Sequence, residues 1–143
     1  MSGMVSLGPL HDYVEYDHAA DSFLDDVLEG LAQSQKKLSS KYFYDERGSQ
    51  LFDDICKLPE YYPTRTETGL LRAHAIEFAG LIGANASVVE FGSGSSTKIR
   101  ILLDALETPV AYIPVDISRE HLLQSAKALA TSYPELPLSL IHI

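Results

Sequence analysis

The second half of the chain alternates between short apolar runs and stretches with helical spacing. Three runs rich in aliphatic residues predict strands, at 87–91, 111–117 and 137–143. Between them, segments 96–106 and 118–130 place apolar residues three and four positions apart, which predicts helices. A strand-helix-strand-helix-strand order is typical of a parallel sheet with right-handed crossovers. We therefore expect an α/β fold over 84–143, the first half of a Rossmann-like sheet, with its strands in spatial order third, second, first.

An N-terminal helical segment precedes this sheet. Residues 20–83 contain three stretches in which apolar residues recur at helical intervals, 20–32, 49–57 and 64–82. In the longest, Thr64 lies three residues before Glu67, the spacing of a capping box, and Gly83 follows the last turn. His74 falls on the apolar side of this helix, so we expect it to be a core residue.

Charge and composition exclude several classes of protein. The chain has 11 Lys and Arg against 20 Asp and Glu, a net charge of −9, and no Lys or Arg precedes Lys36. It has no basic stripe that could neutralise nucleic-acid phosphates, and no stretch approaches the roughly 20 apolar residues of a membrane span. Residues 1–19 predict an acidic, flexible leader without a secretory signal. Cys56 is the single cysteine, which favours a reducing cytoplasm and a small core residue.

The turn after the first predicted strand has the chemistry of a nucleotide site. Glu90, Gly92 and Gly94 form an E-x-G-x-G pattern, and a helix is predicted directly afterwards. Glycines at such a turn let a ligand approach the backbone at the helix N-terminus. Thr97 stands where a dinucleotide fingerprint has its third glycine, which favours S-adenosylmethionine over a nicotinamide dinucleotide. By itself the pattern is equally consistent with a plain strand-to-helix turn.

Two charged residues near this turn could also bind such a ligand. Asp116 ends the second predicted strand, the usual position for a carboxylate that binds two ribose hydroxyls. Its alternative role is to start the helix ahead of Ser118, but the glycine turn upstream favours the ribose role. Lys98 lies in the first turn of a helix, where a cation is unfavourable by about 0.3–1 kcal/mol. An anionic partner would explain that position, and a solvated surface lysine explains it as well.

Aromatic residues gather in two irregular segments of the N-terminal half. They are Tyr42, Phe43, Tyr44, Tyr61 and Tyr62. Tyrosines on loops can form a pocket with an apolar wall and a hydrogen-bonding rim. The pattern alone nevertheless favours simple packing of these rings onto the core. The five histidines show no metal-ligand spacing, so no metal site is predicted.

Three longer strings are more specific than any of these patterns. They read KYFYDERGSQLF (41–52), LPEYYPTRTE (58–67) and VVEFGSGSSTKIRILLDAL (88–106). Together they resemble the histidine-specific, S-adenosylmethionine-dependent methyltransferase family, whose best-known member makes trimethylhistidine for ergothioneine biosynthesis. The resemblance extends over residues 20–138.

The resemblance implies a cofactor, a substrate and the residues that bind them. S-adenosylmethionine would contact Gly92, Lys98 and Asp116. Tyr61 would bind the amino or carboxylate end of an amino acid, with L-histidine the first choice, and Tyr44 would line the same pocket. The implied reaction is methylation of the α-amine by in-line displacement, and no catalytic residue is assigned. A full-length member is expected to be a cytoplasmic monomer without nucleic-acid or membrane partners.

The chain differs from the family pattern in its extent. The family continues for more than the same length again, with an acidic-aromatic pair around the adenine and further side chains around the imidazole and amine. Residues 84–143 would then form a truncated cofactor domain whose strand 87–91 is an unpaired apolar edge. We expect the 143-residue chain alone to be marginally stable and inactive. The alternative is a non-catalytic binding or regulatory half-domain that pairs through this edge.

Overall fold

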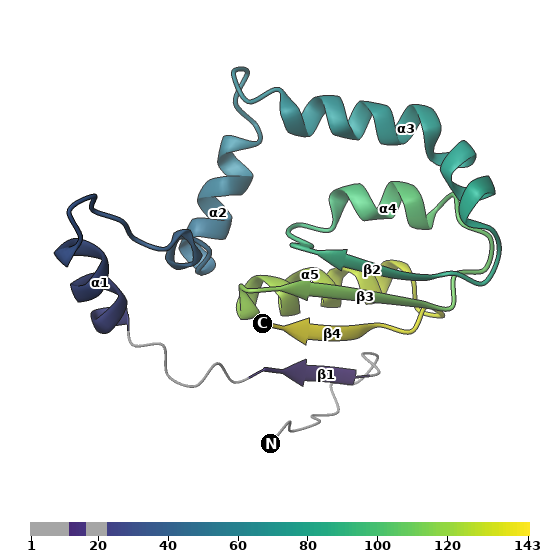
Figure 1. The fold of residues 1–143 in the computed structure, drawn as a ribbon. Coiled ribbons are helices and arrows are strands. Elements are labelled where there is room, and N and C mark those ends of the chain that lie inside the picture. The colour runs from purple at the N-terminus through teal and green to yellow at the C-terminus, as the bar shows by residue number, and fades with distance from the viewer. Residues whose placement is uncertain (1–11, 17–22) are drawn as a thin grey trace.

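The computed structural model describes residues 12–16 and 23–143, and a parallel β-sheet with flanking helices lies at its centre (Figure 1). The strands are β1 (Asp12–Glu15), β2 (Ser87–Phe91), β3 (Ala111–Asp116) and β4 (Ser139–His142). The helices are α1 (Phe23–Ala32), α2 (Glu46–Ile55), α3 (Pro63–Ile82), α4 (Thr97–Leu103) and α5 (Arg119–Ser132), with a 3₁₀ turn η1 (Ser40–Phe43). None of the described helices is long and apolar enough to cross a membrane.

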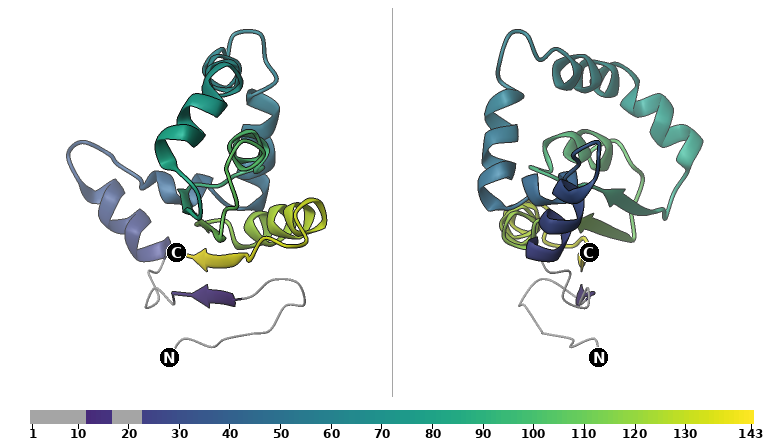
Figure 2. Two further views of the ribbon diagram at one scale, coloured as in Figure 1. Left: turned by 90° about the vertical axis from the view of Figure 1, so that its right-hand side faces the viewer. Right: turned by 60° about the vertical axis from the view of Figure 1, so that its left-hand side comes forward.

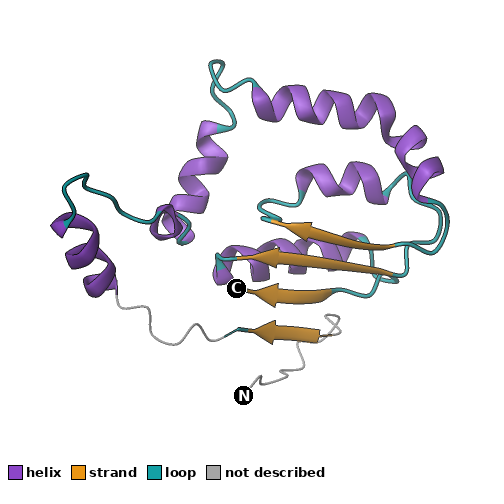
Figure 3. Ribbon diagram, in the orientation of Figure 1, coloured by secondary structure: helices purple, strands orange, loops and turns teal. Residues whose placement is uncertain are grey.

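The strand order is β1-β4-β3-β2, and all neighbouring strands pair in parallel (Figure 3). The predicted order of the three C-terminal strands is confirmed. β2 and β3 are in register, with Phe91 opposite Val115, so both strands end at the same edge of the sheet. The Gly92 amide, directly after β2, donates to the carbonyl of Val115 at 2.8 Å. This register brings the glycine turn beside Asp116.

The sequence patterns did not predict β1. Residues 12–15, expected to belong to a flexible leader, pair with β4, and Tyr13 lies opposite Leu140. Tyr13 is 3% exposed, and its hydroxyl accepts a hydrogen bond from Arg119 Nε at 3.1 Å. A four-residue strand with one buried side chain is too short to give an alternating pattern. The rest of the expected leader, 1–11 and 17–19, lies outside the described residues.

The hydrophobic core lies between the sheet and helices α4 and α5. Its most deeply buried side chains are Tyr112, Leu122, Leu129, Leu138 and Leu140. Two residues of α4, Ile99 and Leu103, belong to the same cluster, so α4 and α5 pack on one core. Helix α3 contacts α4 on the side away from the strands (Figure 2). This stacking places the first turn of α3 above the glycine turn.

Strand β2 is an edge of the described sheet, as expected from the sequence. Val89 is 51% exposed and Phe91 79% exposed. Burying such apolar side chains contributes roughly 25 cal/mol for each Å² removed from water. Along β2 these side chains stay exposed to solvent, so their burial does not contribute to the stability of the described chain.

Helix α3 begins differently from the prediction. Tyr62 is its N-cap residue, Pro63 occupies the first turn, and no side chain caps the helix. Thr64 instead donates a hydrogen bond to Cys56 Sγ at 3.2 Å. The capping-box expectation is wrong because proline, with its fixed φ and missing N–H, already suits the first helical position. The end of the helix at Gly83, with φ of 82°, is confirmed.

Two expectations about core residues are also wrong. The His74 side chain is 47% exposed, and its Nδ1 lies 3.0 Å from a carboxylate oxygen of Glu77. Helical periodicity places His74 on the apolar side, but nothing in the described chain covers that part of α3. Cys56 is partly exposed and lines a cavity instead of the core.

Candidate functional site

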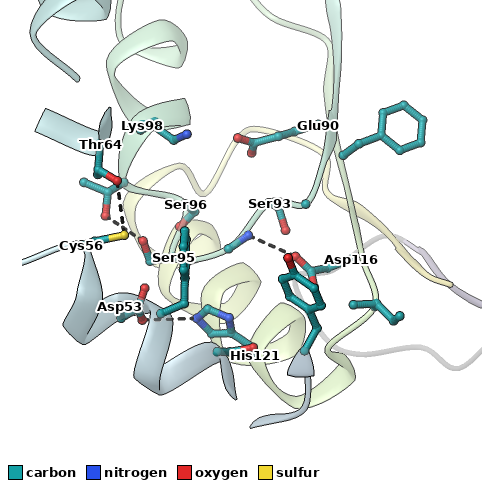
Figure 4. A pocket seen from close by; sticks show the side chains of 18 of the residues that line it. Asp53, Cys56, Thr64, Glu90, Ser93, Ser95, Ser96, Lys98, Asp116 and His121 are labelled. Atoms are coloured by element: carbon teal, nitrogen blue, oxygen red, sulfur yellow. Dashed lines mark hydrogen bonds and ion pairs between the residues drawn. The ribbon is translucent and has the colours of Figure 1, made fainter. Parts of the chain in front are cut away.

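A cavity of about 990 Å³ opens where β2 and β3 end (Figure 4). The turn between β2 and α4 and the end of β3 line one side, while η1, α2 and the start of α3 line the other. Cavities of roughly 300–1,000 Å³ suit small molecules, and open α/β sheets bind ligands at the carboxyl ends of their strands. The cavity therefore joins the helical segment and the sheet into one site.

The turn between β2 and α4 contains three residues in the left-handed region. Gly92 has φ of 68°, Gly94 of 52° and Ser96 of 54°. Glycine adopts this region without steric cost, which explains the first two positions. A Cβ atom at Gly92 would meet no atom within 4 Å, so its φ, and not crowding, requires glycine there. The bare backbone also leaves the turn accessible from the cavity.

Asp116 connects the two loops that follow β2 and β3. Its Oδ2 accepts a hydrogen bond from the Gly94 amide at 3.1 Å, and its Oδ1 accepts one from the Ser118 amide at 2.9 Å. The second bond is the helix-start contact considered from the sequence, although Ser118 is the formal N-cap and makes no side-chain cap. An ionised carboxylate accepts about four hydrogen bonds. Asp116 therefore retains capacity for a ligand in the cavity.

Glu90, near the end of β2, is held in place by a residue of β3. Its Oε2 accepts a hydrogen bond from the Tyr112 hydroxyl at 2.5 Å. Burial raises the pKa of Glu90, while the bond from Tyr112 and the charge of Lys98 oppose this rise. Burial and the bond to Glu90 also raise the pKa of Tyr112 above its ordinary range. The acidic residue of the E-x-G-x-G pattern is thus a fixed member of the cavity wall.

Lys98 has an anionic partner within the chain. Its Nζ donates to Glu67 Oε2 at 2.7 Å, and the two side chains are 41% and 55% exposed. Glu67 belongs to the first turns of α3 and Lys98 to the first turn of α4, and both line the cavity. The sequence placed Glu67 in a capping box, so its role at the cavity was missed.

A buried hydroxyl without a partner lies at the same turn. Ser93 is 6% exposed, lines the cavity, and its Oγ has no hydrogen-bond partner among the described residues. Most buried polar side-chain atoms in folded proteins are hydrogen-bonded. A ligand with polar groups in this cavity would supply the missing partner.

The predicted substrate tyrosines reach the cavity from two segments. Tyr44, just after η1, and Tyr61, just before α3, both line it. The Tyr61 ring packs edge-on against Phe52 of α2, with 5.9 Å between centroids. Tyr42 makes a structural contact instead, because its hydroxyl donates to Asp26 of α1 at 2.5 Å. Tyr62 is 67% exposed and does not line the cavity.

Sequence reasoning missed a second polar contact across the cavity. His121 Nε2 of α5 lies 3.7 Å from Asp53 Oδ2 of α2, and both residues line the cavity. Figure 4 shows this pair below the glycine turn. The two residues are far apart in the sequence, and neither belongs to a motif, so no local signal points to their contact.

The comparison with known families decides among the ligand classes considered above. Residues 23–142 match the family described as "Histidine-specific methyltransferase, SAM-dependent". The chain belongs to this family. The resemblance seen in the three sequence strings is confirmed, and the cofactor of the family is S-adenosylmethionine. The nicotinamide alternative is thereby excluded.

Relatives within this methyltransferase family act on more than one amine. The chain is 42% identical over 135 residues to the histidine N-alpha-methyltransferase of Mycolicibacterium smegmatis, covering 92% of this chain and 42% of that protein. A histidine N-alpha-methyltransferase of Mycobacterium tuberculosis is 42% identical over 119 residues, with 81% and 37% covered. The 4-dimethylallyltryptophan N-methyltransferase of Claviceps purpurea is 30% identical over 129 residues, with 88% and 36% covered. The chain spans about two fifths of the length of these relatives.

Proposed function

We propose that this chain forms the cofactor-binding part of an S-adenosylmethionine-dependent methyltransferase that acts on the α-amine of an amino acid, with L-histidine as the acceptor. One observation carries the proposal. The glycine turn, Asp116 and the unpartnered Ser93 hydroxyl meet in one cavity at the carboxyl ends of β2 and β3. Tyr44 and Tyr61 line the same cavity.

The polar groups of the cavity fit the cofactor. Asp116 accepts hydrogen bonds from two backbone amides and has the remaining capacity to accept ribose hydroxyls. The open backbone at Gly92 allows close approach, and Ser93 Oγ lacks a partner among the described residues. Lys98 supplies a cation for the carboxylate of the cofactor's methionine part. These assignments are proposals that the geometry supports.

The tyrosines would position the acceptor. When bound, the cofactor supplies a methyl group made electrophilic by a sulfonium. Tyr61 and Tyr44 would bind the amino-acid end and accept hydrogen bonds from its amine, so that the nitrogen lone pair points at the methyl group. Holding two reactants in line contributes a large part of the rate enhancement, because the orientational entropy is lost on binding and not in the reaction. Packing against Phe52 restricts the Tyr61 ring before the acceptor binds.

The choice of histidine rests on the two mycobacterial relatives, which are named histidine N-alpha-methyltransferases. The 4-dimethylallyltryptophan relative is similar to this chain over nearly the same span, 129 residues, but at 30% identity. The cavity residues of this chain therefore support an amino-acid amine as the acceptor. The identity of the acceptor's side chain, an imidazole, is proposed from the relatives alone.

Mass spectrometry of the reaction products tests this function. The longest form of the protein that its gene encodes would be incubated with S-adenosylmethionine and either histidine or 4-dimethylallyltryptophan. We expect histidine to gain up to three methyl groups and the tryptophan derivative to remain unmodified. Methylation of the tryptophan derivative alone would contradict the acceptor, and no methylation of any amino-acid amine would contradict the function. A sample without the protein provides the background rate.

A further inference from the structure

Glu67 and Lys98 form a charged pair that the sequence did not predict. The pair lies in the wall of the same cavity, so this inference rests on the proposed function. We propose that the pair recognises both charges of the α-amino-acid end of the cofactor, with Glu67 binding the ammonium and Lys98 the carboxylate. Glu67 would then be a specificity-determining residue of the cofactor site.

The geometry gives both residues access to a ligand. Glu67 comes from α3 and Lys98 from α4, and their charged atoms lie 2.7 Å apart in the cavity wall. Both side chains are about half exposed, at 55% and 41%. Lys98 engages only Oε2 of Glu67, so Oε1 of the carboxylate can accept hydrogen bonds from an ammonium group.

Each of the other carboxylates of the cavity holds another group of the protein in place, and Asp116 is in addition assigned to the ribose. Glu90 is held by the buried Tyr112 hydroxyl. Asp116 accepts two backbone amides, and Asp53 lies against His121. Within the described part of the chain, Glu67 is the cavity carboxylate that contacts only a half-exposed cation, Lys98. It can therefore turn toward a ligand without breaking a buried hydrogen bond.

The chemistry of the ligand complements this pair. An α-amino acid carries an ammonium and a carboxylate on one carbon, so it presents two opposite charges close together. Exposed salt bridges contribute little to stability and exchange partners readily. When the ligand enters, each protein charge keeps an opposite partner, so neither charge is left unpaired in the occupied cavity. An isolated Lys98 would satisfy only the ligand's carboxylate.

Calorimetric titration with three ligands tests the assignment. The longest natural form of the protein would be titrated with S-adenosylhomocysteine, with its analogue lacking the amino group, and with its analogue lacking the carboxylate. We expect Glu67→Gln to lower the affinity for S-adenosylhomocysteine by about tenfold or more, which is the effect of losing a hydrogen bond to a charged group. The same substitution should leave the affinity for the deaminated analogue unchanged. Lys98→Gln should lower the affinity for S-adenosylhomocysteine and leave the affinity for the decarboxylated analogue unchanged.

Matched controls separate recognition from a structural effect. Glu77→Gln changes an exposed carboxylate on the same helix whose partner is His74, outside the cavity, and should leave all three affinities unchanged. Glu67→Asp retains the charge on a shorter side chain, so it should lower the affinity for S-adenosylhomocysteine less than Glu67→Gln does. If Glu67→Gln failed to fold, Glu67→Asp would still test the proposal. Equal losses for S-adenosylhomocysteine and the deaminated analogue would overturn the proposal, as would no loss at all. If the unsubstituted protein bound none of the ligands, the proposed function itself would fail.

Discussion

Asp116 shows how one side chain can serve both the fold and a ligand. Its two oxygens hold the Gly94 and Ser118 amides, which belong to the loops after β2 and β3. The position of the glycine turn therefore depends on this carboxylate as much as on the glycines themselves. Any ligand that uses the remaining acceptor capacity of Asp116 also depends on the fixed distance between the two loops.

Asp116→Asn should weaken S-adenosylhomocysteine binding by about ten- to a hundredfold, because a hydrogen bond to a charged group contributes about 1.5–3 kcal/mol. The amide also places N–H donors beside a backbone donor, which disturbs one of the two loop contacts. Isothermal titration calorimetry would measure the change. Asp104→Asn is a matched control, because Asp104 accepts from Tyr133 away from the cavity. Equal effects of the two substitutions would contradict the assigned role of Asp116.

Glu90 should make stability depend on pH in the direction opposite to a salt-bridged carboxylate. Its pKa is raised mainly by burial, so the folded protein binds this proton more tightly than the unfolded chain. Stability should therefore fall as pH rises from the unfolded value of about 4.3 through the higher folded value. Glu90→Gln retains an acceptor for Tyr112 and should flatten this slope.

Urea unfolding between about pH 4 and pH 7 would measure the slope for both proteins, over the range in which carboxylates with raised pKa titrate. We expect the Gln variant to be at least as stable at neutral pH. A loss of stability larger than about 1 kcal/mol, the scale of one ordinary hydrogen bond, would show that the ionised carboxylate stabilises the fold.

At the scale of elements, the periodicity of apolar residues predicted most helices and strands, but few of the side-chain contacts in the cavity. Helices α3, α4 and α5 and strands β2, β3 and β4 lie within the segments that helical spacing and apolar runs predict from the sequence. β1 was missed because it rests on one buried residue, Tyr13, whose partners lie at the other end of the chain. The Glu67–Lys98 contact was missed because it depends on how α3 packs on α4, and no local spacing encodes that packing.

Helix α2 should hold the substrate side of the cavity in place. Asp53 reaches His121 of α5, and the neighbouring Phe52 packs against Tyr61. Asp53→Ala should therefore weaken histidine binding about two- to fivefold in the presence of S-adenosylhomocysteine, since a partly exposed polar contact contributes up to about 1 kcal/mol. Titration of histidine into the preformed complex would measure this.

Asp54 provides the control for this substitution on the same helix. Its partner is Lys57, and both side chains are largely exposed, at 66% and 73%. Asp54→Ala should leave histidine binding unchanged. If Asp53→Ala lowered the affinity for S-adenosylhomocysteine more than the affinity for histidine, the contact would instead hold the cofactor-binding side of the cavity in place.

For the whole molecule, the open β2 edge is the dominant physical feature. Exposed apolar strand edges promote association between chains, and we expect residues 1–143 alone to be prone to self-association. Val89→Lys places a charge in the middle of β2, where the valine is 51% exposed. It should shift the sedimentation profile toward the monomer without changing the circular dichroism spectrum. An unchanged profile would indicate that the chain associates through another surface, or not at all.

The central claim is that the cavity at the ends of β2 and β3 binds the cofactor of the family. Amide resonances of isotope-labelled protein, followed during a titration with S-adenosylhomocysteine, test this claim most directly. We predict that the Gly92, Gly94 and Ser118 resonances shift together, while that of Gly80, an α3 residue outside the cavity, stays in place. A folded protein whose three loop resonances stay fixed at millimolar ligand would contradict the account.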